Sequence, residues 1–252
     1  MARHNRNYKR IGGIQPIYLP WIGVFEQINA CDLFILYDEL QYNQYNWRNR
    51  NRIKTPTGWE WLTVPVFHRF GQKINEVVID NSRNWRKKHW KSIEQNYRKA
   101  PYFKKYSSVI ENAYLNNWER LVDIDTFIIK NAAMLLGIKT PIILSSELKL
   151  ESKFVASIDL STKRATERII FTCKLMGAKE FYEGASGKNY IDEEYFKAEG
   201  LSIIYQNFQH PVYPQLYDSF VPYMSIIDLL FNCGDRSLQY LTMGMSQPFV
   251  TT

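Results

Sequence analysis

Two short apolar runs near the N-terminus constrain the fold more than any other feature. Residues 11–16 (IGGIQP) and residues 32–39 (DLFILYDE) both have the composition of buried strands. Between them, Ile22, Phe25 and Ile28 recur at helical spacing. Two buried strands joined by a short helix predict a parallel βαβ unit, because parallel strands require a crossover connection.

A second alternation of strands and helices occupies residues 141–205. The runs KTPIILSSEL, KEFY and LSIIY are strand-like, and a helix with Ile169, Ile170, Cys173 and Met176 on its inner side lies between the first two. The sequence therefore predicts an α/β fold with a mostly parallel sheet, either Rossmann-like or nucleotidylyl-transferase-like. We expect one domain over residues 1–252.

Two segments depart from this alternation. Residues 84–136 have helical periodicity throughout and end before Gly137, so they predict a helical insertion. The basic residues 1–10 predict a flexible tail. A hairpin is predicted from the strand-like runs WEWLTVPVF and INEVVID, which a loop around residues 69–71 connects. The segment before it, residues 40–58, is predicted to be a polar, aromatic loop with a turn at Pro56-Thr57-Gly58.

Positive charge is concentrated in one region. The chain carries a formal net charge of +7, and Arg83 to Lys105 alone holds nine Lys and Arg against one Glu. A basic segment of this kind favours an anionic partner, either a phosphorylated ligand, a nucleic acid or a membrane surface. The alternative is a solvated helix face without a partner.

Other classes are disfavoured by what the sequence lacks. The three cysteines, Cys31, Cys173 and Cys233, form no CxxC pair, so no zinc or redox motif is predicted. No apolar run reaches the roughly 18 residues of a membrane span, and no secretory signal follows the basic N-terminus. We therefore expect a cytoplasmic protein with no metal site and no membrane span.

The richest candidate for a site begins where the second strand ends. Asp38 lies at that end, and ligands of open parallel sheets bind at the carboxyl edge. Arginines then alternate at positions 48, 50 and 52, so an extended chain projects them to one face, where guanidinium groups suit phosphates. A solvated surface loop is the alternative. The candidate binding residues of this segment are Gln41, Tyr42, Trp47, Asn49, Arg50, Asn51 and Arg52.

A glycine-containing loop, EGASGKNY, follows a predicted strand. Gly184, Ser186 and Gly187 form either a backbone nest for a phosphate or carboxylate or a plain left-handed turn. The loop matches neither GxGxxG nor a Walker motif. None of the histidines pairs with a Ser or Cys at a catalytic spacing, so a structural role is the alternative for each.

Several blocks of the sequence together resemble one family. QPIYLPWIGVFEQINACDLFILYDELQY, WRNRNRI, WLTVPV, WRKKHWKSIEQNYRKAPYF, LGIKTPIILSSEL, GASGKNY, YPQ and SIIDLLFNCG resemble, in order, those of the WbqC-like proteins. The resemblance covers residues 11–234. It implies a role in bacterial O-antigen and surface-polysaccharide (lipopolysaccharide) biosynthesis, as a transferase that attaches a glycyl, aminoacyl or related acyl group to the amine of a nucleotide-linked amino sugar.

That implied chemistry assigns roles to residues. Amide formation requires a base for the amine and a donor to the oxyanion. Asp38 or His89 is the candidate base, and Gln15, Asn49 or Asn51 the candidate oxyanion donor. Arg50 and Arg52 would hold the diphosphate, and Tyr18 and Trp21 a ring. Gln215 and Asp228, in the last blocks of the resemblance, complete the candidate substrate-binding set.

The donor and two other functions stay open. No tightly bound cofactor is expected, and the acyl donor is an aminoacyl-tRNA, an acyl-CoA or an ATP-activated amino acid, so tRNA is a candidate partner. One alternative is nucleotidyl transfer in a degenerate HxGH-type pocket, although Trp21 and Val24 stand where the two histidines are required. The other is a non-catalytic nucleotide- or RNA-binding protein.

Overall fold

A parallel sheet organises the molecule. The computed structural model describes residues 8–44, 46–154, 161–245 and 249–250. Within these residues six strands form the main sheet, in the order β10-β9-β8-β1-β2-β7. The first five strands of the chain in this sheet are parallel to their neighbours, and β10 is antiparallel to β9. In chain order they are β1 (Arg10–Ile14), β2 (Leu33–Leu36), β7 (Ile142–Leu144), β8 (Glu180–Glu183), β9 (Ser202–Tyr205) and β10 (Phe249–Val250).

The strand order is that of a doubly wound sheet. The chain moves outward from β1 to β2 and β7, then returns to the other side of β1 and moves outward again through β8 and β9. The direction of winding therefore reverses between β1 and β8, which is the topological switch point of such sheets. This arrangement confirms the predicted α/β, Rossmann-like class.

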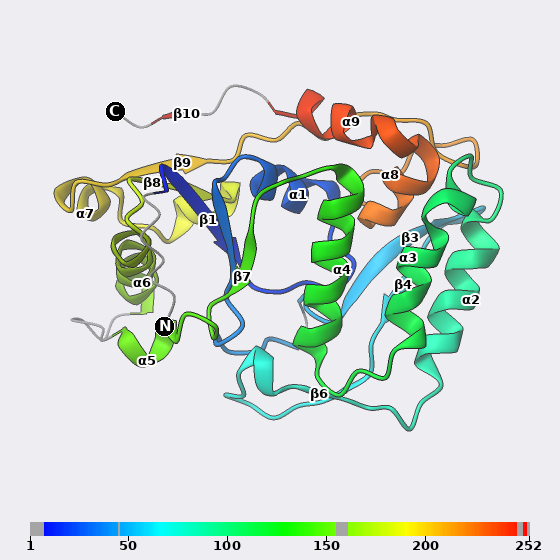
Figure 1. The fold of residues 1–252 in the computed structure, drawn as a ribbon, viewed down its shortest axis with the longest axis horizontal. Helices are drawn as coiled ribbons and strands as arrows, with labels where there is room; N and C mark the ends of the chain where they lie inside the picture. Colours follow the sequence, from blue (N-terminus) through cyan, green and yellow to red (C-terminus); the bar gives the residue numbers. More distant parts are fainter. Residues whose placement is uncertain (1–7, 45, 155–160, 246–248, 251–252) are drawn as a thin grey trace.

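Helices cover both faces of the sheet (Figure 1). Successive residues of β2 point to opposite faces: Phe34 and Leu36 belong to one hydrophobic core, and Leu33 and Ile35 to the other. The first core includes α1 (Ile22–Asn29), α8 (Ile226–Cys233) and α9 (Ser237–Met243). The second includes α5 (Leu150–Lys153), α6 (Ser161–Met176) and α7 (Glu193–Ala198).

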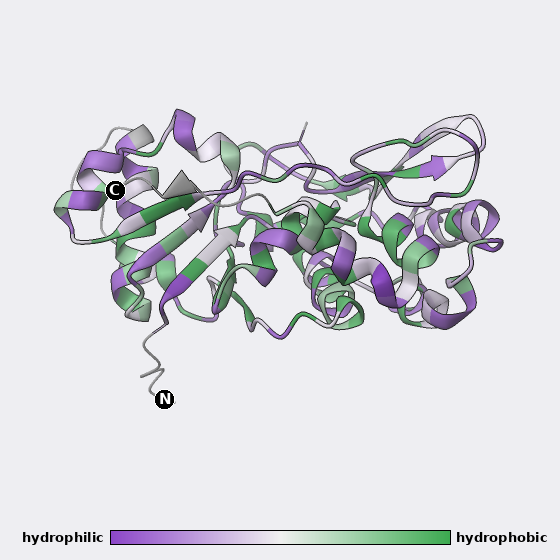
Figure 2. Cartoon of the chain, turned by 90° about the horizontal axis from the view of Figure 1, so that it is seen from above, coloured by the Kyte–Doolittle hydropathy of each residue, from purple (hydrophilic) through white to green (hydrophobic). Residues whose placement is uncertain are grey.

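Three helices between β6 and β7 form the predicted helical insertion. They are α2 (Trp85–Tyr97), α3 (Phe103–Leu115) and α4 (Leu121–Leu136). Gly137 ends α4 with φ of 80°, in the left-handed region that favours glycine. The buried residues of these helices belong to the first core, so the insertion extends that core rather than forming a separate one. Figure 2 shows the resulting elongated outline, with hydrophobic residues in the interior of both ends.

The prediction of the hairpin strands was partly wrong. Residues assigned to a loop form a strand, β3 (Arg50–Thr55), which pairs antiparallel with β4 (Gly58–Thr63). Gly58 has φ of 131°, which permits the tight turn between them. Only β5 (Val66–Phe67) and β6 (Val78–Ile79) pair as predicted.

The basic N-terminal segment is tied to the sheet at its C-terminal end. Residues 1–7 lie outside the described residues. The backbone N–H groups of Lys9 and Arg10 both donate to Asp32 Oδ2 at 2.9 Å, and Arg10 pairs with Glu180. Lys9 and Arg10, which the prediction placed in the tail, are therefore held at the edge of β1. Among the described residues, no helix is long and apolar enough to cross a membrane.

Candidate functional site

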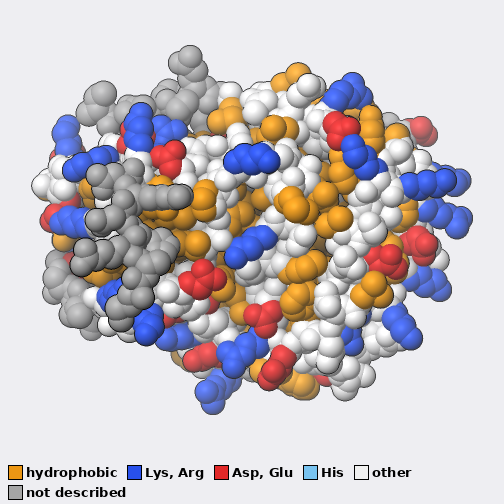
Figure 3. Space-filling model, in the orientation of Figure 1, with side chains coloured by type: hydrophobic (Ala, Val, Ile, Leu, Met, Phe, Trp, Pro, Cys, Tyr) orange, Lys and Arg blue, Asp and Glu red, His pale blue; other side chains and the backbone are white. Residues whose placement is uncertain are grey.

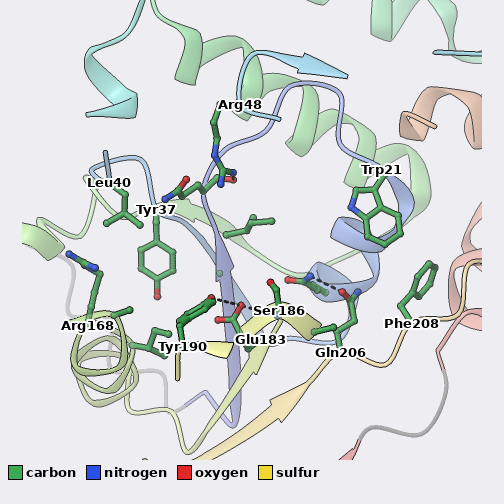
Figure 4. A pocket seen from close by; sticks show the side chains of 18 residues that line it. Trp21, Tyr37, Leu40, Arg48, Arg168, Glu183, Ser186, Tyr190, Gln206 and Phe208 are labelled. Carbon is green, nitrogen blue, oxygen red and sulfur yellow. Dashed lines mark hydrogen bonds between the residues drawn. The ribbon is translucent and has the colours of Figure 1, made fainter. Parts of the chain in front are cut away.

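A cavity of about 620 Å³ opens at the switch point of the sheet (Figure 4). Its walls come from the carboxyl ends of four strands: Gln15 follows β1, Tyr37 follows β2, Glu183 ends β8 and Gln206 follows β9. Gly13 contributes backbone, and a Cβ there would lie 2.5 Å from the ring of Tyr37. The absence of a side chain at Gly13 thus lets the ring of Tyr37 pack over β1. The location is the one at which doubly wound sheets bind ligands.

Glu183 is a carboxyl group in the wall of this cavity, and its surroundings shift its pKa. Its side chain is only 9% exposed, and Oε1 accepts hydrogen bonds from the Gly184 N–H (3.0 Å) and the Tyr190 hydroxyl (3.2 Å). Burial raises the pKa of Glu183 to about 7, against the lowering effect of those two donors. A carboxyl group with that pKa can both accept and return a proton near neutral pH.

Two arginines supply positive charge at opposite walls. Arg168, on α6, forms a forked pair with Glu151, with Nε–Oε1 at 2.5 Å and Nη2–Oε2 at 3.3 Å. Arg48 donates from Nη1 to the backbone oxygen of Gln15 at 3.1 Å, and its Nε has no hydrogen-bond partner among the described residues. Burial lowers the pKa of Arg48 to about 10, so the group stays charged at neutral pH. Both guanidinium groups are therefore held in fixed positions at the cavity wall, with the charge of Arg168 paired to Glu151.

A buried amide network forms the wall between α1 and β9. Gln27 Nε2 donates to Gln206 Oε1 at 3.0 Å, and Gln206 Nε2 donates to the Gly23 oxygen at 2.8 Å and to Glu26 Oε2. Tyr182 donates to the other Glu26 oxygen at 2.7 Å. Burial raises the pKa of Glu26. The network fixes the orientation of both amides, which lie at the cavity wall.

Two further cavities adjoin the first. One, of about 580 Å³, shares Gln15 and Arg48 with it and is otherwise lined by the loop after β2 and by residues 68–70, so the predicted Gln41 and Tyr42 lie there. The other, of about 310 Å³, shares Trp21 with the first cavity. Its remaining lining residues are Ile17, Trp47, Asn51, Arg52 and Tyr223. Gln15 and Trp21 thus separate neighbouring cavities.

The predicted arginine loop is divided by the structure. Arg48 lines the first cavity, whereas Arg50 and Arg52 share the outer face of β3, as the alternation predicted. Asn49 is buried and donates to the Val64 oxygen at 2.9 Å. Asn51 donates to the Tyr18 oxygen at 3.3 Å. The two asparagines therefore hold the hairpin in place through hydrogen bonds to the backbone. The sequence did not predict this structural role.

Asp38 lies at the end of β2, as predicted, but holds the sheet edge together. It is 1% exposed, and its two oxygens accept from the Ser145 hydroxyl (2.9 Å), the Ser146 N–H (3.0 Å) and hydroxyl (2.6 Å), and Asn75 Nδ2 (3.3 Å). It lines none of the three cavities. Four donors occupy the lone pairs that a general base needs, so the prediction of Asp38 as the base gains no support.

His89 and Tyr18 lie in the core and not in a cavity. A hydrogen bond of 2.9 Å joins His89 Nδ1 to the Tyr18 hydroxyl, which also bonds to the Tyr114 hydroxyl at 2.7 Å. Burial lowers the pKa of His89 to about 4, so the ring is neutral at physiological pH. The arrangement matches the structural alternative for this histidine.

Gln215 and Asp228 form a second buried cluster away from the switch point. Asp228 accepts from the Tyr97 hydroxyl (3.0 Å), the Tyr213 hydroxyl (2.9 Å) and Gln215 Nε2 (2.7 Å). Burial raises the pKa of Asp228 to about 6. The cluster joins α2, α8 and the loop before α8, and its predicted role in substrate binding has no cavity to support it.

The loop after β8 is a short 3₁₀ helix, η2 (Ala185–Asn189), and not a left-handed turn. Gly184 and Ser186 line the cavity, as predicted for a ligand loop. A Cβ at Gly187 would lie 2.2 Å from Glu183 Cγ, so this glycine allows the loop to pack on the carboxylate side chain. The predicted αL alternative is wrong, because Gly184 has φ of −62° and Gly187 also lacks a positive φ.

Sequence reasoning missed Glu183, Arg168, Tyr37, Gln27 and Gln206. A signal for Glu183 was present, because it ends a predicted strand just before a glycine loop, as Asp38 follows another strand. Arg168 lies on a helix whose only strong sequence signal is its apolar face, formed by Ile169, Ile170, Cys173 and Met176. Among the described residues, no group of three or more His, Cys, Asp or Glu is placed to hold a metal.

Comparisons with known proteins identify relatives without a described activity. A family model described as the WbqC-like protein family matches residues 15–240. The uncharacterized protein Rv1507c of Mycobacterium tuberculosis is 35% identical over 237 residues, which cover 92% of this chain and 97% of that protein. No solved structure matches the chain.

Proposed function

Since the chain belongs to the WbqC-like protein family, we propose that it is a transferase that acylates the amine of a nucleotide-linked amino sugar at the switch-point cavity. The observation that carries the proposal is Glu183, a buried carboxyl group with a pKa of about 7 at the carboxyl end of β8. In this role it replaces Asp38 and His89.

Glu183 supplies the proton transfer that acylation requires. A sugar ammonium group must lose a proton before its nitrogen can attack, and a base with a pKa near the working pH serves best. That first proton passes to solvent, and the neutral amine attacks the acyl carbon. Glu183 accepts a second proton from the nitrogen as the new C–N bond forms. It returns this proton to the carrier oxygen or sulfur as the bond between that atom and the acyl carbon breaks.

The other cavity residues suit the remainder of the substrate. Arg168 and Arg48 bear the positive charge that a diphosphate requires. The fixed amides of Gln27 and Gln206 suit sugar hydroxyl groups, and Trp21 with Phe208, whose rings are 5.7 Å apart, suits a base or sugar ring. Gln15 lies in the wall shared by two cavities, where its amide could donate to the oxyanion.

The proposal is tested with UDP-glucosamine, which has a free amine, and with UDP-glucose, which lacks it. Each compound is incubated with the protein and with glycyl-tRNA, glycyl-CoA, or glycine and ATP. The masses of the products are then determined by mass spectrometry. We expect a glycyl mass gain on UDP-glucosamine alone. If neither compound binds to the protein or gains mass with any donor, the proposed function is wrong.

A further inference from the structure

Aromatic and cationic side chains together cover the outer face of the β3–β4 hairpin. Trp47, Trp59 and Trp61 are 40%, 44% and 39% exposed, an unusual amount of indole surface in contact with solvent. The guanidinium of Arg52 lies 5.4, 5.0 and 5.9 Å from the centres of these three rings in the same order. That of Arg50 lies 4.7 Å from Trp61. These five residues are named here the hairpin surface.

The hairpin surface connects the switch-point cavity to the basic helix α2. At one end, Trp47 and Arg52 line the 310 Å³ cavity, whose Trp21 is also a wall of the switch-point cavity. At the other end, Trp59 lines a shallow depression together with Lys88 and Lys91 of α2. Figure 3 shows Lys and Arg side chains along the edge of the molecule where α2 lies. Aromatic rings and cations therefore occur together along this path, which also contains the Glu60 carboxylate, hydrogen-bonded to Ser92 and Asn96.

The backbone at the inner end of this surface is strained. Tyr223 has φ of 60°, a left-handed conformation that costs a non-glycine residue about 1 kcal/mol or more. Its N–H donates to His210 Nε2 at 3.1 Å, and its ring lies 5.3 Å from that of Trp21. Arg52 Nη2 donates to the Tyr223 oxygen at 3.4 Å. The strain places a third aromatic ring in the wall of the 310 Å³ cavity, as expected of a ligand-binding feature.

We propose that the hairpin surface binds the single-stranded end of an RNA and directs it past Trp21 toward the switch-point cavity. Exposed rings stack on unpaired bases, and neighbouring cations neutralise the phosphates between them. A neutral sugar chain would need the rings but not the cations, and a duplex would hide its bases from the rings. If the proposed function is right, the RNA is the carrier of the acyl group.

Binding is measured by fluorescence anisotropy with a short fluorescein-labelled RNA, single-stranded or annealed to its complement. We expect the single strand to bind at least about tenfold more tightly than the duplex. Trp59→Ala with Trp61→Ala should weaken single-strand binding by about tenfold or more, because each substitution removes a ring on which a base stacks. Phe70→Ala removes a 98% exposed ring elsewhere and should change nothing.

Salt dependence separates the contribution of α2. Lys88→Ala with Lys91→Ala should reduce the slope of log K against log salt by about 1.4, since each of the two phosphate contacts contributes about 0.7 for single strands. Lys179→Ala with Lys197→Ala, a matched exposed pair outside this surface, should leave the slope unchanged. Three results would overturn the proposal. They are equal binding of single-stranded and duplex RNA, unchanged binding after the tryptophan substitutions, and displacement of the labelled RNA by a neutral dextran oligosaccharide as readily as by unlabelled RNA.

The same variants also separate this inference from the proposed function. Thermal shift with UDP-glucosamine reports on the switch-point cavity, which none of the altered residues lines. Retained UDP-glucosamine binding without RNA binding contradicts the hairpin inference alone. RNA binding without UDP-glucosamine binding or acyl transfer leaves the surface assigned and contradicts the proposed function.

Discussion

Two carboxyl groups at the ends of parallel strands have opposite surroundings. Asp38 accepts four hydrogen bonds, which use its oxygens to hold the surrounding loops together. Glu183 accepts two, from Gly184 and Tyr190, and burial dominates its pKa. Similar positions in the sequence thus give one carboxylate that holds the fold and one suited to proton transfer.

At the residue scale, Glu183→Gln should abolish the proton transfer without altering the cavity. We expect kcat/KM for UDP-glucosamine acylation to fall by about 100-fold or more. In the wild type, the rate should rise as pH increases through about 7, because Glu183 must be deprotonated to act as a base. The variant should lack this limb in its pH–rate profile. A variant with wild-type rate and profile would exclude Glu183 from the mechanism.

The same substitution should stabilise the fold at alkaline pH. Folding raises the pKa of Glu183 from 4.5 to about 7, so its stabilising effect is complete below pH 4.5 and is lost as pH rises through 7. At pH 8.5 the buried charge costs about 3 kcal/mol, at 1.36 kcal/mol per pKa unit. Urea unfolding should therefore show Glu183→Gln to be more stable than wild type at pH 8.5 and similar at pH 4.5. Equal stabilities at both values would contradict the raised pKa.

His89 gives the opposite dependence on acid. Folding lowers its pKa from 6.5 to about 4, so its stabilising effect is present above pH 6.5 and lost as pH falls through 4. We expect His89→Gln to reduce the loss of unfolding free energy between pH 6.5 and 4, measured by urea titration at each pH. His68→Gln, an exposed histidine, is the control and should follow the wild type.

At the scale of elements, Asp38 connects the loops that follow β2 and β7. Asp38→Ala leaves the Ser145 and Ser146 donors without their shared acceptor, and we expect a loss of roughly 3 kcal/mol in unfolding free energy. Glu147→Ala, an exposed carboxylate on the adjacent loop, should change stability by less than about 0.5 kcal/mol. Urea denaturation measures both, and equal effects would contradict the structural role of Asp38.

The sequence predicted buried strands well and the polar hairpin poorly. The central residues of β1, β2, β7, β8 and β9 are mostly apolar because helices cover both faces of the sheet. In β3, only Asn51, Ile53 and Lys54 are buried, and Asn51 and Lys54 are polar. Lys54 is buried because Nζ donates to the oxygens of Tyr217 and Ser219, more than 160 residues along the chain. Such long-range pairing leaves no local signal.

At the scale of the whole molecule, the site combines the two halves of the doubly wound sheet. Gln15 and Tyr37 come from one half, and Glu183 and Gln206 from the other, so their proximity depends on the order of strands. Sequence reasoning predicted the edge of the sheet but not which strands adjoin there. It therefore selected Asp38 at the end of β2 and missed Glu183 at the end of β8.

Ligand binding at this junction should stabilise the entire fold. UDP-glucosamine at 100 times its Kd should add about 2.7 kcal/mol to the unfolding free energy and raise Tm accordingly. Arg168→Ala should reduce this shift, because the residue lines the cavity, whereas Arg164→Ala, an exposed position one turn earlier on α6, should keep it. An equal shift in both variants would remove Arg168 from the binding site.

The central position of β1 also has a consequence for biosynthesis. One edge of β1 pairs with β2 soon after both are made, but the other pairs with β8, and Arg10 and Glu180 are 170 positions apart. At about 5–20 residues per second, a ribosome takes on the order of 10–30 seconds to make that stretch. During this interval an apolar strand edge is unprotected, so we expect the nascent chain to recruit chaperones until β8 emerges.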